Sequence, residues 1–307
     1  MERWRGVEKI PTKWGRCVVT IGVFDGVHRG HQLIIGHAVE KARELGVPSV
    51  VLTFDPHPIE VIRPGSHPPL LTDQRYKADL VEQLGVDVFC VIPFTVDFMK
   101  LTAAEFVHDI LVERLHASSI VVGDNFRFGH GGAGTVASLT ADGKRFGFTV
   151  DPFGLQGSGE LTWSSTYVRS SVAAGDVATA ADALGRPHRI YGLVVRGDQR
   201  GRKIGYPTAN LQPLPWSAVP ADGIYAGRLV RGKELLPAAI SIGTNPTFAG
   251  TERRVEAFVL DFNGDLYGES VGLEFTARLR DTEKFADTDA LLEQMAIDVE
   301  RTRSLVG

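Results

Sequence analysis

The chain has 307 residues, of which 43% are hydrophobic and 23% charged, and its formal net charge is −4. This length favours two domains, and the high apolar content with a low net charge excludes a disordered chain. The sequence lacks the run of about 18 apolar residues that a membrane span needs, and mixed charges in residues 1–9 argue against a signal peptide. A pI near 6.1 argues against a general binder of nucleic acid or membrane surfaces.

Up to about residue 185, strand-like and helix-like segments alternate. Apolar or β-branched runs predict strands, and apolar residues at helical spacing predict the helices between them. Strands separated by helices of this length imply right-handed crossovers and a mostly parallel sheet with helices on both faces. The expected strands are 17–23, 48–54, 86–94 and 119–123, and the expected helices are 30–45, 72–84, 102–115 and one or two within 163–185.

From residue 189 onward the helical spacing is lost, and short apolar runs predict an antiparallel β-barrel. Asn263-Gly264 between two such runs predicts a tight hairpin. Residues 287–301 regain helical spacing and predict a C-terminal helix. The link around Gly185 and Pro187 predicts a boundary between domains 1–185 and 186–307. The expected strands are 189–196, 223–230, 235–243, 254–262 and 266–279.

The two cysteines, Cys17 and Cys90, lie inside apolar runs of the first domain. A single disulfide between two cysteines could not hold together a fold of this size, so we expect buried thiols in a reducing compartment. Together with the composition, this indicates a cytoplasmic enzyme or ligand binder.

The segment 22–31, Gly-Val-Phe-Asp-Gly-Val-His-Arg-Gly-His, joins the first strand to the first helix. Ligands of open α/β sheets bind at the carboxyl ends of strands, and glycines before a helix N-terminus suit a phosphate. His28 and His31 fall on one face of the first helical turn, where both imidazoles can stabilise charge on phosphoryl oxygens. A glycine-rich turn with two surface histidines is the alternative, but this spacing favours the phosphate site. The candidate nucleotide contacts here are Gly22, Phe24 and Asp25.

A second motif, Ser164-Ser165-Thr166-Tyr-Val-Arg169, places hydroxyl groups at an expected helix start and an arginine one turn later. Such groups can clamp the β- and γ-phosphates of ATP, although any capped helix can carry the same residues. With the HxGH segment, this motif resembles the nucleotidylyltransferase superfamily.

Two loops at expected strand ends, 53–58 (Thr-Phe-Asp-Pro-His-Pro) and 123–129 (Gly-Asp-Asn-Phe-Arg-Phe-Gly), offer aromatic rings beside polar groups. Ordinary loop packing is the alternative for each. With the 22–31 segment they resemble the FAD synthetase module of bacterial bifunctional riboflavin kinase/FAD synthetases, although the glycine-rich loop 130–135 departs from that family's polar pattern. The resemblance implies flavin contacts from Phe54, Pro56, His57, Pro58, Asn125 and Phe128.

In the second domain, residues 196–205 combine glycines with basic residues but do not form a Walker A loop. Such a loop can cradle phosphates through backbone N–H groups, and a solvated basic turn is the alternative. Tyr-Pro-Thr208-Ala-Asn210 follows, and the side-chain oxygens of Thr208 and Asn210 are suitable ligands for Mg²⁺. This context resembles the riboflavin kinase signature, which implies nucleotide contacts at Gly197, Gly201, Arg202 and Gly205.

The same resemblance implies that Glu256 is the general base and that Arg280 contacts the flavin. A carboxylate can accept the proton of a primary alcohol as its oxygen attacks a γ-phosphate, although Glu256 taken alone is more often an exposed strand residue. The resemblance covers nearly the whole chain. It implies phosphorylation of riboflavin by Mg·ATP to FMN, followed by adenylyl transfer from ATP to FMN, which gives FAD and pyrophosphate. We expect small-molecule substrates, no nucleic acid or membrane partner, and a monomer or weak homo-oligomer.

Two other functions stay open at this point. A nucleotidylyltransferase for another phosphate ester, such as a cytidylyl or pantetheine acceptor, would explain the first two motifs but not the second domain. A flavin- or nucleotide-binding regulator without catalysis should carry damaged motifs, whereas the motif residues are all present: His28, His31, Arg169, Thr208, Asn210 and Glu256.

Overall fold

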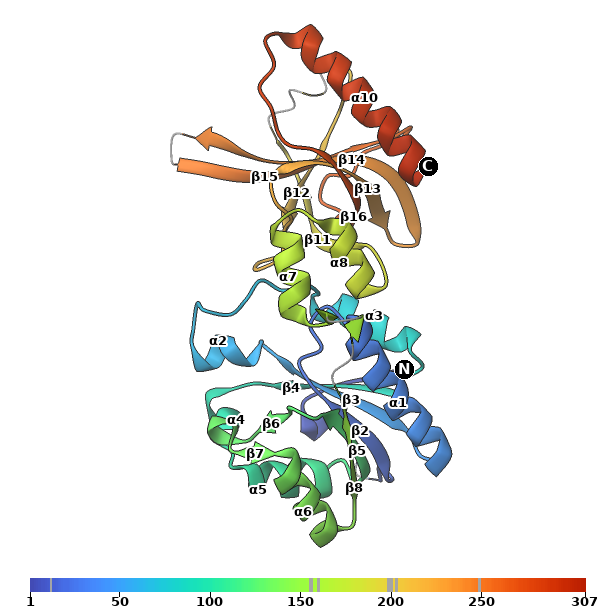
Figure 1. The fold of residues 1–307 in the computed structure, drawn as a ribbon, viewed down its shortest axis with the longest axis vertical. Helices are drawn as coiled ribbons and strands as arrows, with labels where there is room; N and C mark the ends of the chain where they lie inside the picture. The colour runs from blue at the N-terminus through green and yellow to red at the C-terminus, as the bar shows by residue number, and fades with distance from the viewer. Residues whose placement is uncertain (12, 155–156, 159–160, 198–200, 202–203, 248–249) are drawn as a thin grey trace. The chain divides into compact units, whose positions relative to one another are not determined.

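The computed structural model describes residues 1–11, 13–154, 157–158, 161–197, 201, 204–247 and 250–307, and only the backbone at 157–158, 161, 245–247 and 250–252. Its backbone contacts divide the chain into two compact units (Figure 1). The first comprises residues 1–68 and 74–163, and the second comprises residues 69–73 and 164–307.

The first unit is built on a six-stranded parallel sheet with the order β1-β4-β3-β2-β5-β8. The order runs outward from β2, through β3 and β4 on one side and through β5 and β8 on the other. Right-handed crossovers in opposite directions place helices on opposite faces, so the predicted doubly wound sheet is confirmed. The strands are β1 Glu2–Arg5, β2 Cys17–Ile21, β3 Ser49–Asp55, β4 Val88–Pro93, β5 Ala117–Gly123 and β8 Thr149–Phe153.

Several helices of this unit begin or end at a capping residue. Helix α1 starts after His28 and ends at Gly46, whose left-handed backbone (φ 65°) stops it. Thr102 caps the predicted 102–115 helix through a capping box with Glu105, but from Phe106 the helix widens into a π-helix. The helices are α1 Arg29–Leu45, α2 Pro58–Ile62, α3 Gln74–Gln83, α4 Val96–Met99, α5 Ala103–Glu105, η2 Phe106–Val112 and α6 Val136–Phe146.

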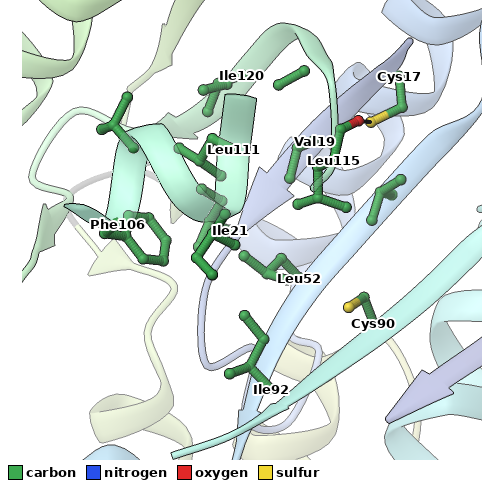
Figure 2. Packing of buried hydrophobic residues seen from close by; sticks show 14 of the residues in the cluster. Cys17, Val19, Ile21, Leu52, Cys90, Ile92, Phe106, Leu111, Leu115 and Ile120 are labelled. Atoms are coloured by element: carbon green, nitrogen blue, oxygen red, sulfur yellow. Dashed lines mark hydrogen bonds between the residues drawn. The ribbon is translucent and has the colours of Figure 1, made fainter. Parts of the chain in front are cut away.

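The core of the first unit lies between the sheet and the helical segment that precedes β5. Figure 2 shows part of it, with side chains of the π-helix and the following turn lying over β2 and β3. Cys17 Sγ donates a hydrogen bond to the Leu115 carbonyl at 3.0 Å, drawn as a dashed line. Cys17 and Cys90 are both buried free thiols, and burial raises the pKa of each to about 12.

The second unit contains a closed antiparallel barrel with the strand order β11-β12-β15-β14-β13-β16. Helix α8 packs on β11 and β16, and α10 packs on β13, β14 and β16. The predicted barrel and its C-terminal helix are therefore confirmed. The elements are α7 Ser165–Ala173, α8 Val177–Leu184, β11 His188–Val195, β12 Ala209–Pro213, β13 Gly223–Arg231, β14 Glu234–Thr247, β15 Gly250–Val259, β16 Ser270–Arg280 and α10 Thr288–Val306.

The predicted hairpin at Asn263-Gly264 is wrong. Strand β15 pairs with β12 and β14, whereas β16 pairs with β11 and β13, so the strands on either side of this dipeptide are not neighbours. Leu266 is buried in the barrel core, and the Asp265 carboxylate accepts a hydrogen bond from the Tyr267 N–H at 2.9 Å. The long ladders of the barrel and the burial of Leu266 thus outweigh a local turn preference.

Candidate active sites

The turn between β2 and α1 is strained and lies where the strand order of the sheet reverses. Phe24, Gly26 and Val27 have φ values of 49°, 84° and 41°. Left-handed backbone at a residue other than glycine costs on the order of 1–3 kcal/mol, and it persists only where the surroundings fix it. Such strain is typical of functional turns, and this is the expected ligand edge of an open α/β sheet.

The two histidines of this turn lie against each other. His28 is the N-cap of α1, and its Nδ1 accepts a hydrogen bond from the His31 N–H at 3.4 Å. A neutral His28 therefore carries its proton on Nε2. The imidazole rings are stacked with centroids 3.6 Å apart, as the sequence spacing predicts. A Cβ on Gly30 would lie 3.2 Å from the His28 ring, so glycine leaves room for this stack.

The other residues predicted to bind the nucleotide in this turn are buried around it. Phe24 is 3% exposed and Asp25 is 2% exposed, and the Phe24 ring meets His31 edge-on at 5.2 Å. A Cβ on Gly22 would lie 3.0 Å from the Phe24 ring. The turn therefore depends on small residues at both ends.

The serine-rich motif begins α7 and belongs to the second compact unit, whereas the histidines belong to the first. Ser164 is the N-cap and its hydroxyl accepts a hydrogen bond from the Tyr167 N–H at 3.1 Å. Ser165 and Thr166 begin the helix, and Arg169 Nε donates to the Pro69 carbonyl at 2.8 Å. The joint phosphate clamp of the two motifs stays a prediction.

A cavity of about 780 Å³ opens beside the histidine turn, and six phenylalanine rings contribute to its wall. Three of the predicted flavin contacts, Phe54, Pro58 and Phe128, line it, and so do Gly22 and Val23. Arg127 and His130 bring polar groups to the wall, and two glycines of the 130–135 loop complete it. The phenylalanines of the wall are Phe54, Phe94, Phe98, Phe106, Phe126 and Phe128.

Sequence reasoning missed Phe94, Phe98 and Phe106 as cavity residues. Phe94 directly follows β4. Its place at the end of a strand could therefore have predicted it as a cavity residue, as for the other two loops. Phe98 and Phe106 lie on helical segments, where aromatic residues are usually core residues.

Pro56, His57 and Asn125 belong to the same two loops as the lining residues Phe54, Pro58 and Phe128, but they do not line the cavity. Pro56 follows a cis peptide bond, and the His57 Nδ1 accepts a hydrogen bond from the Ile59 N–H at 3.2 Å as the N-cap of α2. A Cβ on Gly123 would lie 3.1 Å from Asn125 Oδ1, so the Asn125 side chain folds back over the end of β5. Their flavin contacts stay predictions.

In the barrel, the register between β12 and β15 brings the predicted metal ligands to the predicted base. Asn210 pairs with Glu256 across the antiparallel ladder, and Thr208 Oγ1 donates to Glu256 Oε2 at 3.3 Å. Thr208 and Glu256 line a cavity of about 290 Å³, and Thr208 also lines a second cavity of about 70 Å³. Thr208 thus lines both barrel cavities.

The walls of the larger barrel cavity combine apolar and aromatic side chains with polar and charged ones. Strands β13 and β14 and helix α10 contribute aliphatic side chains to it, and Tyr206, Phe258 and Phe285 contribute rings. Arg280 lines this cavity, and its predicted flavin contact stays a prediction; its guanidinium pairs with the buried Asp298 at 2.8 and 3.0 Å. The ion pair fixes α10 to the end of β16.

The glycines of the loop before β12 leave room for the Asn210 side chain and for the backbone at Tyr206. A Cβ on Gly197 would lie 2.4 Å from Asn210 Oδ1, and one on Gly201 would lie 2.2 Å from the Tyr206 carbonyl oxygen. Gly205 has a φ of 87°, which favours glycine. Arg202 lies outside the described residues.

Each half of the chain matches the model of a known protein family. Residues 10–167 match the family model for FAD synthetase, and residues 184–306 match the model for riboflavin kinase. In the part of the chain that the structure describes, no helix has the length and apolarity needed to cross a membrane.

Curated relatives align over nearly the full length of the chain. Bifunctional riboflavin kinase/FMN adenylyltransferases from Pseudomonas fluorescens and Escherichia coli K12 are 39% and 38% identical, covering 100% and 95% of this chain and 98% and 93% of theirs. A crystal structure described as a macrolide-efflux protein from Streptococcus pneumoniae has a TM-score of 0.89 and 34% identity, covering 99% of both chains. The chain belongs to the family of bacterial bifunctional riboflavin kinase/FMN adenylyltransferases.

Proposed function

We propose that this chain makes both flavin cofactors. In this proposal residues 186–307 phosphorylate riboflavin to FMN, and residues 1–185 join FMN to ATP, giving FAD and pyrophosphate. The observation that supports both steps is the presence of two aromatic-lined cavities, one beside the histidine turn and one beside Thr208 and Glu256. The order of the two matching family models supports the same assignment.

In the kinase step, the Glu256 carboxylate accepts the proton of the riboflavin 5′-hydroxyl as that oxygen attacks the γ-phosphorus of ATP. The new P–O bond forms while the bond to ADP breaks, and the proton stays on the carboxylate until solvent removes it. Phosphoryl transfer needs positioning and charge stabilisation more than covalent catalysis. We assign the flavin ring to the cavity of Phe258 and Arg280, and the nucleotide to Gly197, Gly201, Arg202 and Gly205.

A magnesium ion fits the donor set beside Glu256. Thr208, Asn210 and Glu256 bring a hydroxyl, an amide and a carboxylate oxygen together on facing strands, and Mg²⁺ prefers oxygen ligands with few protein contacts. We propose that Thr208 and Asn210 hold it. When bound with ATP, the ion neutralises charge on the phosphates.

In the adenylyl transfer step, a phosphate oxygen of FMN attacks the α-phosphorus of ATP, and pyrophosphate leaves. The protein supplies positioning and donors for the developing negative charge rather than a nucleophile. We assign this role to His28 and His31. The flavin contacts are Phe54, Pro56, His57, Pro58, Asn125 and Phe128, and the nucleotide contacts are Gly22, Phe24, Asp25, Ser164, Ser165, Thr166 and Arg169.

We further propose that the enzyme works in the cytoplasm on small molecules, without a nucleic-acid or membrane partner, as a monomer or weak homo-oligomer. The acidic pI of 6.1 supports the absence of a polyanionic partner.

The test is a chromatographic time course of the purified protein with riboflavin, ATP and Mg²⁺. We expect riboflavin to fall, FMN to rise transiently and FAD to accumulate. Accumulation of FMN without FAD would refute the assignment of residues 1–185. Unchanged riboflavin with conversion of supplied FMN to FAD would refute the assignment of the barrel. Turnover of neither flavin would favour a nucleotidylyltransferase for another acceptor.

A further inference from the structure

Lys77 is a buried charged residue that neither proposed site uses. It lies in α3 with 3% of its surface exposed, on the same helix face as the buried Leu80 and Val81. Lysine is rarely buried to this extent, because removing an ammonium group from water is costly. An apolar side chain would fill the position at lower cost, so packing alone does not explain the charge.

The Lys77 ammonium reaches the backbone of the histidine turn. Its Nζ donates to the Val23 carbonyl oxygen at 2.8 Å, and Thr53 Oγ1 of β3 donates to the same oxygen at 3.1 Å. A carbonyl oxygen has two lone pairs, so two side chains from different elements satisfy this acceptor. Thr53 is 0% exposed, and hydrogen bonds away from water are electrostatically stronger.

Val23 stands where the extended backbone of β2 changes into the left-handed turn. Phe24 follows it with a φ of 49°, and the turn ends at His28, the cap of α1. A backbone of this kind keeps its shape only where neighbouring groups fix it. Fixing the Val23 carbonyl fixes the peptide plane from which the turn starts, and therefore the path of the chain to both histidines.

We propose that Lys77 is a positioning residue for adenylyl transfer. It acts through the Val23 carbonyl, with Thr53 as the second donor, and holds His28 and His31 in the geometry that the transfer requires. The proposal rests on the function proposed above for these histidines. Lys77 acts on the path of the backbone that leads to the histidines, so its loss lowers the rate of transfer more than it lowers the affinity for substrate.

The first experiment compares Lys77→Met with the wild type in both reactions of the full chain. We expect kcat for FAD formation from supplied FMN to fall about 100-fold, as misplacement of catalytic groups by about 1 Å does. KM for ATP and FMN should change by a smaller factor than kcat, because the lost interaction acts mainly in the transition state. Riboflavin phosphorylation by the same preparation reports an intact barrel and should be unchanged. Lys144→Met, on the exposed face of α6, is the matched control, and the urea midpoint of unfolding of both variants reports the folding of the first unit. An unchanged kcat for FAD formation would overturn the proposal.

Thr53 allows a second, independent test, because its hydroxyl donates to the same Val23 carbonyl oxygen. We expect Thr53→Val to lower kcat about tenfold and Thr53→Ser, which keeps the hydroxyl, to restore it. The losses of Lys77→Met and Thr53→Val should combine to less than their product, because both act on one carbonyl. Independent losses, or a Thr53→Val variant as active as the wild type, would overturn the proposal even if Lys77→Met failed to fold.

His28→Ala, measured in parallel, separates this inference from the proposed function. If His28→Ala retains full FAD synthesis, the function proposed for the turn fails. If His28→Ala loses FAD synthesis while Lys77→Met keeps it, only the role of Lys77 fails.

Discussion

The histidine turn and the Thr208–Glu256 pair are positioned in opposite ways. In the barrel, the backbone ladder between β12 and β15 places Asn210 opposite Glu256, and the side chains follow from the register. In the first unit, side chains place the backbone, because Lys77 and Thr53 hold the Val23 carbonyl of a strained turn. A site on paired strands should therefore resist remote changes, whereas a site on a turn should be sensitive to them.

The largest expected effect is the loss of the base in the barrel. Glu256→Gln keeps the size of the side chain but removes its basicity, and a general base contributes about 10²–10⁴-fold to rate. We expect kcat for FMN formation to fall by this factor while FAD formation from supplied FMN is unchanged. Both are measured by chromatography of the flavins, with the exposed Glu293→Gln of α10 as the control. A parallel loss of both activities in folded protein would contradict separate sites.

The corresponding change in the turn is His28→Ala. Loss of a preorganised donor to a developing charge costs about 10²–10³-fold in kcat, so FAD formation should fall by that factor and riboflavin phosphorylation should not. The exposed His108→Ala of the π-helix controls for loss of an imidazole. A His28→Ala variant that forms FAD at the wild-type rate would show that the turn has no part in the chemistry.

Glu274 tests whether the barrel site resists a remote change. It forms a largely buried ion pair with Arg189 across β11 and β16, and removing one partner of such a pair costs about 3 kcal/mol of stability. We expect Glu274→Gln to lower the urea midpoint of unfolding, while kcat for riboflavin phosphorylation stays within about twofold because the β12–β15 register is untouched. A large fall in kcat with little loss of stability would contradict the expectation that a site on paired strands resists remote changes.

The smallest effect is expected at Cys17 and Cys90, the two buried thiols of the parallel sheet. Burial raises the pKa of Cys17 and Cys90 to about 12, and the thiolate is the reactive form. At pH 8, iodoacetamide should leave both thiols of the folded protein unmodified and alkylate both in urea, as mass spectrometry will show. Rapid alkylation of the native protein would mean that the core at the start of β2 opens readily.

Much of the fold was predictable because its signals are local. The helical spacing of residues 30–45 places the start of α1 within one residue of its observed position. Strand β1 was missed because three of its four residues are exposed, so it lacks an apolar run. The Asn263-Gly264 hairpin was wrong because the pairing partners of β15 and β16 lie far along the chain.

By itself, the sequence determined which residue types stand next to one another in each motif, and it predicted candidate site residues from them. The spacing of His28 and His31, and the Thr208-Ala-Asn210 run, are fixed by neighbouring positions in the chain. Only the tertiary structure brought Glu256 to Thr208, Lys77 to Val23, and six phenylalanines around one cavity. The two hydrogen bonds join residues 48 and 54 positions apart. Burial and strand pairing across the whole fold decide such contacts, because no local preference reaches that far.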